Sequence, residues 1–350
     1  MKSPPSRCRL RRLFLLVAGL AVAATGALAD AVAPKPLYRD PVYDGAADPV
    51  VIWNPAAQRW WMFYTNRRAN RPELSGVAWV HGTPIGIAES ADGGITWKYA
   101  GDADIQLPPE LTTEPRTLWA PDVFGAPDGT YHMFLTVVPG VFEDWNHPRT
   151  IVHLTSRDLR RWDHARPLTL ASDRVIDAVV RQLPDGSWRM WYNNERDHKA
   201  IYYADSPDLA TWTDRGKCDG TSERPGEGPY VFEFQGVNWM LVDVWRGIGV
   251  YRSDDLLHWT VQPGNLLEEP GHGTDDGSNG QHVGVVVNHG RAWCFYFVHP
   301  RKPGGAVDAK GRPAVERRSS IQVVELIVRD GVLTADRNAP VAIKLVQPQP

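Results

Sequence analysis

The chain has 350 residues, of which 43% are hydrophobic and 23% charged, and its formal net charge is −3. A mildly acidic protein with scattered basic residues is poorly suited to bind nucleic acids or anionic membrane surfaces. We therefore expect neither class of partner.

The N-terminal segment has the pattern of a secretory signal peptide. Basic residues precede an apolar run over 13–28, and Ala27-Leu28-Ala29 then offers a small-x-small cleavage site. The run is short for a membrane span. We predict that residues 1–29 are removed, that the protein is exported to the periplasm or the medium without membrane attachment, and that residues 30–350 form one domain. Loss of five basic residues would change the net charge from −3 to −8.

Two cysteines remain after that cleavage, Cys218 and Cys294. An oxidising compartment permits a disulfide between them. Neither has the spacing of a redox or zinc motif, and sequence does not show whether their Cα atoms approach closely enough for a bridge. A disulfide is therefore left open.

From residue 49 onward the chain repeats one unit five times. Each unit is an apolar strand, a turn and an aromatic-rich strand, and turns such as Asp128-Gly129 are typical of β-hairpins. The units cover residues 49–64, 120–135, 176–192, 228–242 and 282–297. No sustained helical period lies between them. We predict an all-β fold, a five-bladed β-propeller with four-stranded antiparallel blades, and expect a monomer.

A second repeat follows the first four hairpins. It reads Ser-x-Asp with a Trp four or five residues after the Asp, and its copies begin at Ser90, Ser156, Ser206 and Ser253. We expect a turn after the third strand of each blade, held by the Ser and Asp side chains and wedged by the Trp. The fifth unit lacks this motif, and residues 36–42 are expected to supply a closing strand to its blade. Two long connections, 66–83 and 270–281, suggest function.

Ionisable residues lie at the start of the first strand of every unit. In a propeller these strands line the central channel, so their leading residues meet at one mouth. They are Asp48, Asp122, Asp177, Glu227 and His282. Crowded carboxyl groups shift one another's pKa values, and a glycosidase needs one protonated acid and one ionised base. Asp122 is equally compatible with a cap at its strand start, and His282 with a ligand for a cation or water.

These residues and their neighbours resemble glycoside hydrolase family 43 over essentially the whole mature chain. The matching segments are Asp48-Pro49, Trp119-Ala120-Pro121-Asp122-Val123, Ile176-Asp177, Glu227-Gly228-Pro229-Tyr230-Val231-Phe232, Gln281-His282 and Phe297-Val298-His299. The resemblance implies a five-bladed propeller and hydrolysis with inversion. It implies Asp48 as general base, Glu227 as general acid and Asp177 as the residue that tunes and orients the acid. His282 matches a channel histidine often associated with calcium or water, although the chemistry requires no cofactor.

Two departures limit what the resemblance implies about the sugar. Ala178 follows Asp177 where the family commonly has proline, and the insertion over 66–83 is not a general family feature. The candidates for holding the sugar are Asp122, Trp119, Arg116, His81, Arg246 and His282.

We expect an exo-acting enzyme that hydrolyses plant or algal oligosaccharides of the arabinoside, xyloside or galactoside class. One alternative is a non-catalytic carbohydrate-binding propeller with Trp119 or Trp245 as platforms. The other is a glycosidase of a related propeller family, of the anhydro-galactosidase, fructosidase or sialidase type. The motif at Ser90 is a complete sialidase-like Asp-box, but sialidases usually have six blades.

Overall fold

The structure is a computed structural model that describes residues 1, 31–111, 115–221, 223–300 and 316–348. The account below concerns the compact unit that runs from Ala31 to Pro350. Apart from Met1, the predicted signal peptide lies outside the described residues. In the described part of the chain no helix reaches the length and apolarity that a membrane crossing requires.

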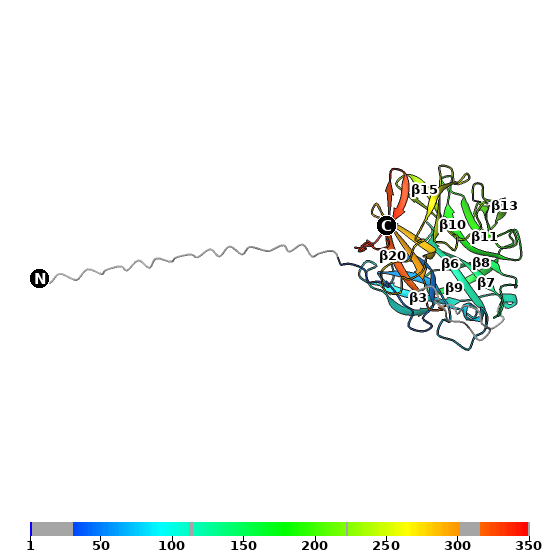
Figure 1. Cartoon of the computed structure of the whole chain (residues 1–350), viewed down its shortest axis with the longest axis horizontal. Helices are drawn as coiled ribbons and strands as arrows, with labels where there is room; N and C mark the ends of the chain where they lie inside the picture. The colour runs from blue at the N-terminus through cyan, green and yellow to red at the C-terminus, as the bar shows by residue number, and fades with distance from the viewer. Residues whose placement is uncertain (2–30, 112–114, 222, 301–315, 349–350) are drawn as a thin grey trace. The chain divides into compact units, whose positions relative to one another are not determined.

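Five antiparallel sheets follow one another along the chain, in the order of the colours in Figure 1. Blade 1 comprises β1 (Ala46–Asn54), β2 (Arg59–Asn66), β3 (Ile85–Ser90) and β4 (Lys98–Asp102). Blade 2 comprises β6 (Thr117–Gly125), β7 (Tyr131–Val138), β8 (Thr150–Ser156) and β9 (Arg161–Pro167), with the short β5 (Asp104–Ile105) parallel to β9. Blade 3 comprises β10 (Val175–Gln182), β11 (Trp188–Asn194), β12 (Ala200–Ser206) and β13 (Thr213–Lys217).

Blade 4 comprises β14 (Glu227–Phe234), β15 (Val237–Asp243), β16 (Ile248–Ser253) and β17 (Thr260–Leu266). Blade 5 comprises β18 (Gln281–Asn288), β19 (Arg291–Val298), β20 (Ser320–Arg329) and β21 (Val332–Ala335). The helices in the described residues are two single 3-10 turns, η1 (Ala78–Val80) and η2 (Pro109–Leu111).

The first strands of the blades form a closed ring. β1 contacts β6, β6 contacts β10, β10 contacts β14, β14 contacts β18, and β18 returns to β1. The predicted five-bladed propeller is therefore confirmed, and five blades are one fewer than a sialidase usually has. The ring brings the leading ends of five strands that are distant in sequence to one mouth of the channel.

The Ser-x-Asp motifs form the turns between third and fourth strands, as predicted. In blade 1, Ser90 donates to Asp92 at 2.8 Å, and Asp92 in turn accepts the amide of Thr96 at 2.9 Å. The equivalent Ser–Asp contacts recur at Ser156, Ser206 and Ser253. The carboxyl oxygens of these aspartates accept hydrogen bonds within the turn. The aspartates lie on a different part of each blade from the channel mouth.

Tryptophans of the blades pack in the core as expected. Trp162, Trp191, Trp239 and Trp293 are among the largest fully buried side chains. The ring of Phe63 in blade 1 meets Trp162 of blade 2 edge to face at 5.9 Å, so aromatic contacts of this kind join neighbouring blades.

Two expectations outside the site are settled by the structure. The fourth strand of blade 5 is β21 rather than residues 36–42, because the chain turns back at 330–331 and pairs with β20. In the N-terminal segment, Tyr38 makes an isolated bridge to Ile321. Cys218 and Cys294 are both free and lie in different hydrophobic clusters, so no disulfide joins them.

Candidate active site

A β-bulge interrupts the first strand of every blade at the same place. Each bulge adds one residue relative to the neighbouring strand, and bulges of this kind re-aim side chains. The bulge residues, all at positive φ, are Asp48 (53°), Ala120 (44°), Asp177 (60°), Gly228 (58°) and His282 (21°). Thus the fold itself, rather than loop conformation, presents Asp48, Asp177 and His282 at one mouth.

Blade 2 contributes no carboxylate at this level, because its bulge residue is Ala120. Asp122 lies two residues further along β6, where it is buried and accepts the amide of Val180 at 2.8 Å and Arg181 Nη1 at 3.4 Å. Burial raises the pKa of Asp122. Asp122 therefore ties β6 to β10 and does not line the cavity, which corrects the expectation that it walls the site.

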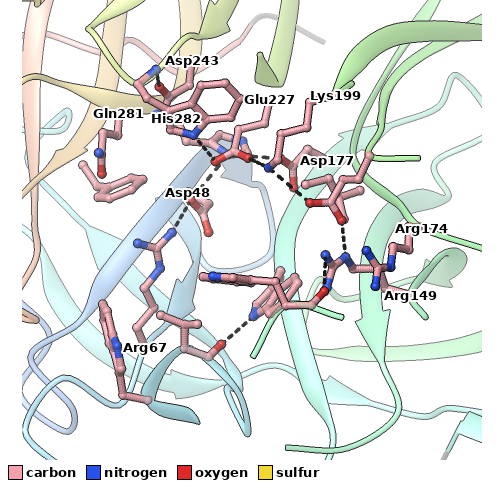
Figure 2. A pocket seen from close by; sticks show the side chains of 18 of the residues that line it. Asp48, Arg67, Arg149, Arg174, Asp177, Lys199, Glu227, Asp243, Gln281 and His282 are labelled. Carbon is pink, nitrogen blue, oxygen red and sulfur yellow. Dashed lines mark hydrogen bonds and ion pairs between the residues drawn. The ribbon is translucent and has the colours of Figure 1, made fainter. Parts of the chain in front are cut away.

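The mouth opens into a cavity of about 710 Å³, shown in Figure 2. Its lining comes from all five blades and from the insertion in blade 1. The lining residues are Asp48, Arg67, Trp79, Val80, Trp119, Trp145, Arg149, Arg174, Ile176, Asp177, Glu195, Lys199, Glu227, Asp243, Trp245, Gln281, His282, Phe297 and His299. The three predicted catalytic residues are therefore brought together, from blades 1, 3 and 4.

Asp48 is held on two sides. Arg67, the first residue after β2, places its Nη2 3.3 Å from Asp48 Oδ1, and His282 Nδ1 lies 3.5 Å from the same oxygen. Asp48 is 6% exposed. The guanidinium of Arg67 offsets part of the cost of removing this carboxyl group from water.

Asp177 and Glu227 are linked through the backbone. The amide of Gly228, which follows Glu227, donates to Asp177 Oδ2 at 3.1 Å. Burial, then the charges of Glu227 and Asp48, raises the pKa of Asp177 well above its usual range. The crowding of these carboxyl groups therefore disfavours the ionised form of Asp177.

The Glu227 carboxylate has two donors. Lys199 Nζ lies 2.7 Å from its Oε2, and Trp245 Nε1 donates to its Oε1 at 3.1 Å. Burial lowers the pKa of Lys199, but the charges of Glu227 and Glu195 outweigh this and raise it. Lys199 is thus a cation in the wall beside the predicted acid.

Asp243 stands directly across the β14–β15 pair from Glu227. Its carboxyl accepts the amides of Trp245 at 2.7 Å and His282 at 3.1 Å. Burial, followed by the charge of Glu227, raises the pKa of Asp243 to about 7. Asp243 therefore positions both the tryptophan that contacts Glu227 and the bulge of blade 5.

His282 lies in the cavity between two of the carboxyl groups. Its Nδ1 is 3.5 Å from Asp48 and 3.9 Å from Asp177. Asp275 and Asp276, in the connection before β18, pair with Arg318 and Arg337, respectively. The described residues include no group of three or more His, Cys, Asp or Glu placed to hold a metal. This donor set does not match the six to eight oxygen ligands of calcium.

An aromatic wall bounds one side of the cavity. Trp119 donates from Nε1 to the carbonyl of Val80 at 2.6 Å and lies 6.0 Å from Trp145. His81 stacks behind Trp119 at 5.1 Å and contacts the carbonyl of Phe142 at 2.7 Å. Burial lowers the pKa of His81 to about 4. Trp119 thus faces the cavity, while His81 supports it from outside the lining.

Two predicted sugar-binding residues lie elsewhere. Arg116 donates to the carbonyl of Ile105 at 3.0 Å. Arg246 has a side chain that is 79% exposed and pairs with Glu268 at 3.0 Å. Neither lines the cavity.

Several lining residues were not singled out from the sequence. They are Arg67, Arg149, Arg174, Glu195, Lys199 and Asp243. The run Glu195-Arg196-Asp197-His198-Lys199, five ionisable residues directly after β11, was the available signal for two of them. Trp79 and Arg67 belong to the insertion over 66–83, which contributes to the pocket as its length suggested.

Solved structures share this fold. The chain superposes on a thermostable family-43 glycoside hydrolase with a TM-score of 0.57 and 17% identity, over 89% of this chain and 98% of that one. The GH43_1 enzyme from Xanthomonas citri complexed with xylotriose gives a TM-score of 0.58 and 15% identity, over 83% and 90%. A xylan beta-1,4-xylosidase from Bacillus halodurans C-125 gives 0.58 and 15%, over 89% and 61%.

These likenesses establish a common fold with family-43 glycoside hydrolase structures. At the sequence level, no protein-family model matches the chain. No curated protein is significantly similar to it.

Proposed function

We propose that this protein is an exported, exo-acting glycoside hydrolase of the family-43 type that inverts the anomeric centre. The observation that carries the proposal is the meeting of Asp48, Asp177 and Glu227, from three blades, in one cavity. A folded protein gathers several acidic side chains in a concave site at a cost in stability. The N-terminal signal-like sequence supports export.

In the proposed single displacement, Asp48 deprotonates a water molecule that attacks the anomeric carbon. Glu227 gives its proton to the departing glycosidic oxygen. Asp177 raises the proton affinity of Glu227 by like-charge repulsion and, through the Gly228 amide, fixes the backbone beside it. His282 and Arg67 orient Asp48.

The cavity supports action on the end of a glycan chain. Its volume of about 710 Å³ lies in the range that encloses a small ligand, and Trp79, Trp119 and Trp145 supply apolar faces for a sugar ring. Complexes with xylose and xylotriose are described for structures of the same fold. We propose plant or algal arabinosides, xylosides or galactosides as the starting panel.

A non-catalytic sugar-binding propeller is the second candidate. The specific observation in its favour is the contact of Lys199 with Glu227, because an ammonium group stabilises the ionised form of the group that must act as acid.

Turnover by a matched pair of variants separates the two candidates. Nitrophenyl arabinosides, xylosides and galactosides, with plant and algal oligosaccharides, form the panel. Glu227→Gln should lose at least about 100-fold in kcat, whereas Glu233→Gln, at an exposed position of the same strand, should keep wild-type activity. Normal turnover by Glu227→Gln would disprove the assigned acid. Binding without hydrolysis by the wild type would establish the second candidate.

A further inference from the structure

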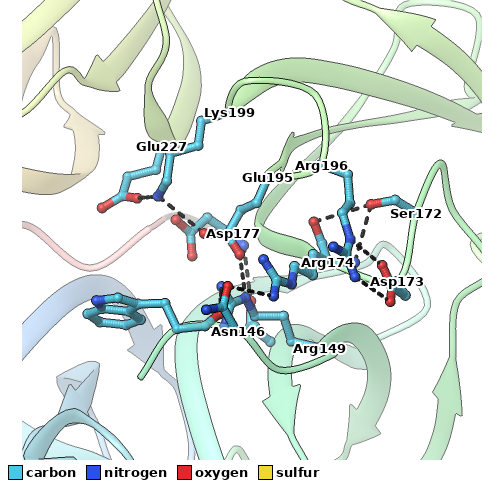
Figure 3. A network of polar contacts seen from close by, with 12 residues as sticks. Asn146, Arg149, Ser172, Asp173, Arg174, Asp177, Glu195, Arg196, Lys199 and Glu227 are labelled. Atoms are coloured by element: carbon cyan, nitrogen blue, oxygen red, sulfur yellow. Dashed lines mark hydrogen bonds and ion pairs between the residues drawn. The ribbon is translucent and has the colours of Figure 1, made fainter. Parts of the chain in front are cut away.

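Three cations line one side of the cavity beside Glu227. Arg149 begins the segment that leads into β8, Arg174 precedes β10, and Lys199 precedes β12. In Figure 3, Arg149 and Lys199 both contact Glu195, Lys199 also contacts Glu227, and Arg174 contacts Asn146. We refer to Arg149, Arg174 and Lys199 as the cationic wall.

Fewer carboxylates contact the cationic wall than the wall has positive charges. Glu195 is shared, since its Oε2 contacts Arg149 Nε and its Oε1 lies 3.2 Å from Lys199 Nζ. Glu227 pairs with Lys199 at 2.7 Å. When Glu227 is protonated to act as an acid, Glu195 is the carboxylate among the described residues that still contacts the cationic wall, through Arg149 and Lys199.

Neighbouring acids do not make up the difference. Asp173, next to Arg174 in sequence, is engaged with Arg196 at 2.7 Å on the surface. Asp177 is engaged elsewhere, because its Oδ2 accepts the amide of Gly228 at 3.1 Å and lies 3.9 Å from His282 Nδ1. Arg174 itself donates from Nη2 to the neutral amide oxygen of Asn146 at 3.1 Å.

Two guanidinium nitrogens of the wall have no hydrogen-bond partner among the described residues. They are Nη1 of Arg149 and Nε of Arg174, and both atoms are buried. Arg149 is 3% exposed as a whole residue. Buried donors of this kind are costly unless a partner is provided, and both residues line the cavity into which a sugar would enter.

We propose that the cationic wall binds an oxoanion carried by the sugar, a uronate carboxylate or a sulfate ester. This inference rests on the proposed carbohydrate-binding role of the cavity and names the class of its substrate as acidic glycans. Guanidinium groups match the planar geometry of carboxylate and sulfate oxygens and form charge-assisted hydrogen bonds with them. A neutral hydroxyl would leave the excess positive charge uncompensated.

Equilibrium binding of four derivatives of the same hexose tests the proposal without relying on turnover. The probes are galactose, methyl galacturonate, galacturonate and galactose 6-sulfate, with glucose, methyl glucuronate, glucuronate and glucose 6-sulfate as a second series. Isothermal titration and quenching of cavity tryptophan fluorescence give Kd. In at least one series, the uronate or the sulfate ester should bind at least about 10-fold tighter than the neutral sugar and the methyl ester. Which of the two anions binds tighter distinguishes a carboxylate site from a sulfate site.

Arg174→Met should reduce that advantage to within about 2-fold, and Arg174→Lys should retain part of it. The matched control is Arg196→Met, which removes a nearby surface arginine that does not line the cavity and should leave the preference unchanged. Thermal unfolding checks that each variant is folded.

Equal binding of charged and neutral sugars by the wild type in both series would overturn the proposal, as would an unchanged preference in folded Arg174→Met. Failure of the proposed hydrolase is a different outcome. If the protein prefers the anions but cleaves no glycoside, the proposal of anion binding by the cationic wall stands and only the catalytic assignment fails.

Discussion

The backbone amide of Gly228 donates a 3.1 Å hydrogen bond to Asp177 Oδ2. This contact crosses from blade 4 to blade 3 and ties the residue after the proposed acid to the carboxyl group proposed to tune it. The bulge amides of blades 2, 3 and 5 likewise donate to side chains of the preceding blade, at Thr65, Thr136 and Asp243.

Replacing Asp177 by Asn should lower kcat and change the pH profile. The amide oxygen can still accept from Gly228, but the negative charge that raises the proton affinity of Glu227 is gone. The alkaline limb of kcat against pH should therefore move to lower pH, and kcat at its optimum should fall by about 10-fold or more. An alkaline limb that stays in place would show that Asp177 does not tune the acid.

Gly228→Ala should destabilise the fold by about 2–4 kcal/mol. Gly228 has φ of +58°, and a Cβ there would lie 2.7 Å from His282 Nδ1. Gly236→Ala in the same blade is the matched control, because its φ is +75° with no atom within 4 Å of the added Cβ, and it should cost about 1–2 kcal/mol. Chemical unfolding monitored by tryptophan fluorescence measures both. Equal losses would mean that close packing on His282 adds nothing.

Asp243→Asn should flatten the dependence of stability on pH. The pKa of Asp243 is raised to about 7 in the folded protein, so the folded state binds more protons than the unfolded state between pH 4 and 7. Stability must then fall as pH rises through this window. The wild type should lose on the order of a few kcal/mol between pH 4 and 8, and the variant less.

The control for Asp243 is Asp254→Asn, at an exposed position in the turn between β16 and β17 of the same blade. It should reproduce the wild-type slope of unfolding free energy against pH. Identical slopes for all three proteins would show that Asp243 is ionised throughout in the folded state.

Trp119→Ala should weaken substrate binding more than it slows the chemical step. The ring faces the cavity and is supported by His81 and by Arg149, whose guanidinium lies 5.5 Å from the ring centre. We expect KM to rise by about 10-fold, or about 1.4 kcal/mol. Trp53→Ala removes a half-buried tryptophan that does not line the cavity, and its KM should be that of the wild type. A selective loss of kcat would assign Trp119 to the chemistry instead.

Much of the fold follows from the sequence because each blade repeats its own local signals. Hairpin turns such as Asp185-Gly186 and the Ser-x-Asp motifs specify strand pairing within a blade, and five copies specify the blade number. The positions of Asp48, Asp177 and Glu227 at one mouth then follow from the inner strands starting at the same end.

The position of the bulges explains why the prediction for Asp122 was wrong. Asp48 and Ala120 each occupy the bulge of their strand, whereas Asp122 lies two residues past it, so the counterpart of Asp48 in blade 2 is Ala120. Proline follows the bulge residue in blades 1, 2 and 4, at Pro49, Pro121 and Pro229, and alignment on these prolines gives the correct position.

The cationic wall was harder to predict. Arg149 and Arg174 approach the cavity from connections in two blades, and their proximity depends on the angle between those blades. No spacing in the sequence encodes that angle. The placement of residues 36–42 is likewise not encoded in any spacing. β21 pairs with residues 326–329 of β20, and Tyr38 bridges to Ile321 near the start of the same strand.

The stereochemistry of hydrolysis tests the central claim most directly. Proton NMR during the first minutes of cleavage of an accepted glycoside reports which anomer forms before mutarotation. If Asp48 activates water while Glu227 protonates the leaving oxygen, the first product has the configuration opposite to that of the substrate. A first product that keeps the substrate's configuration would contradict the single-displacement mechanism.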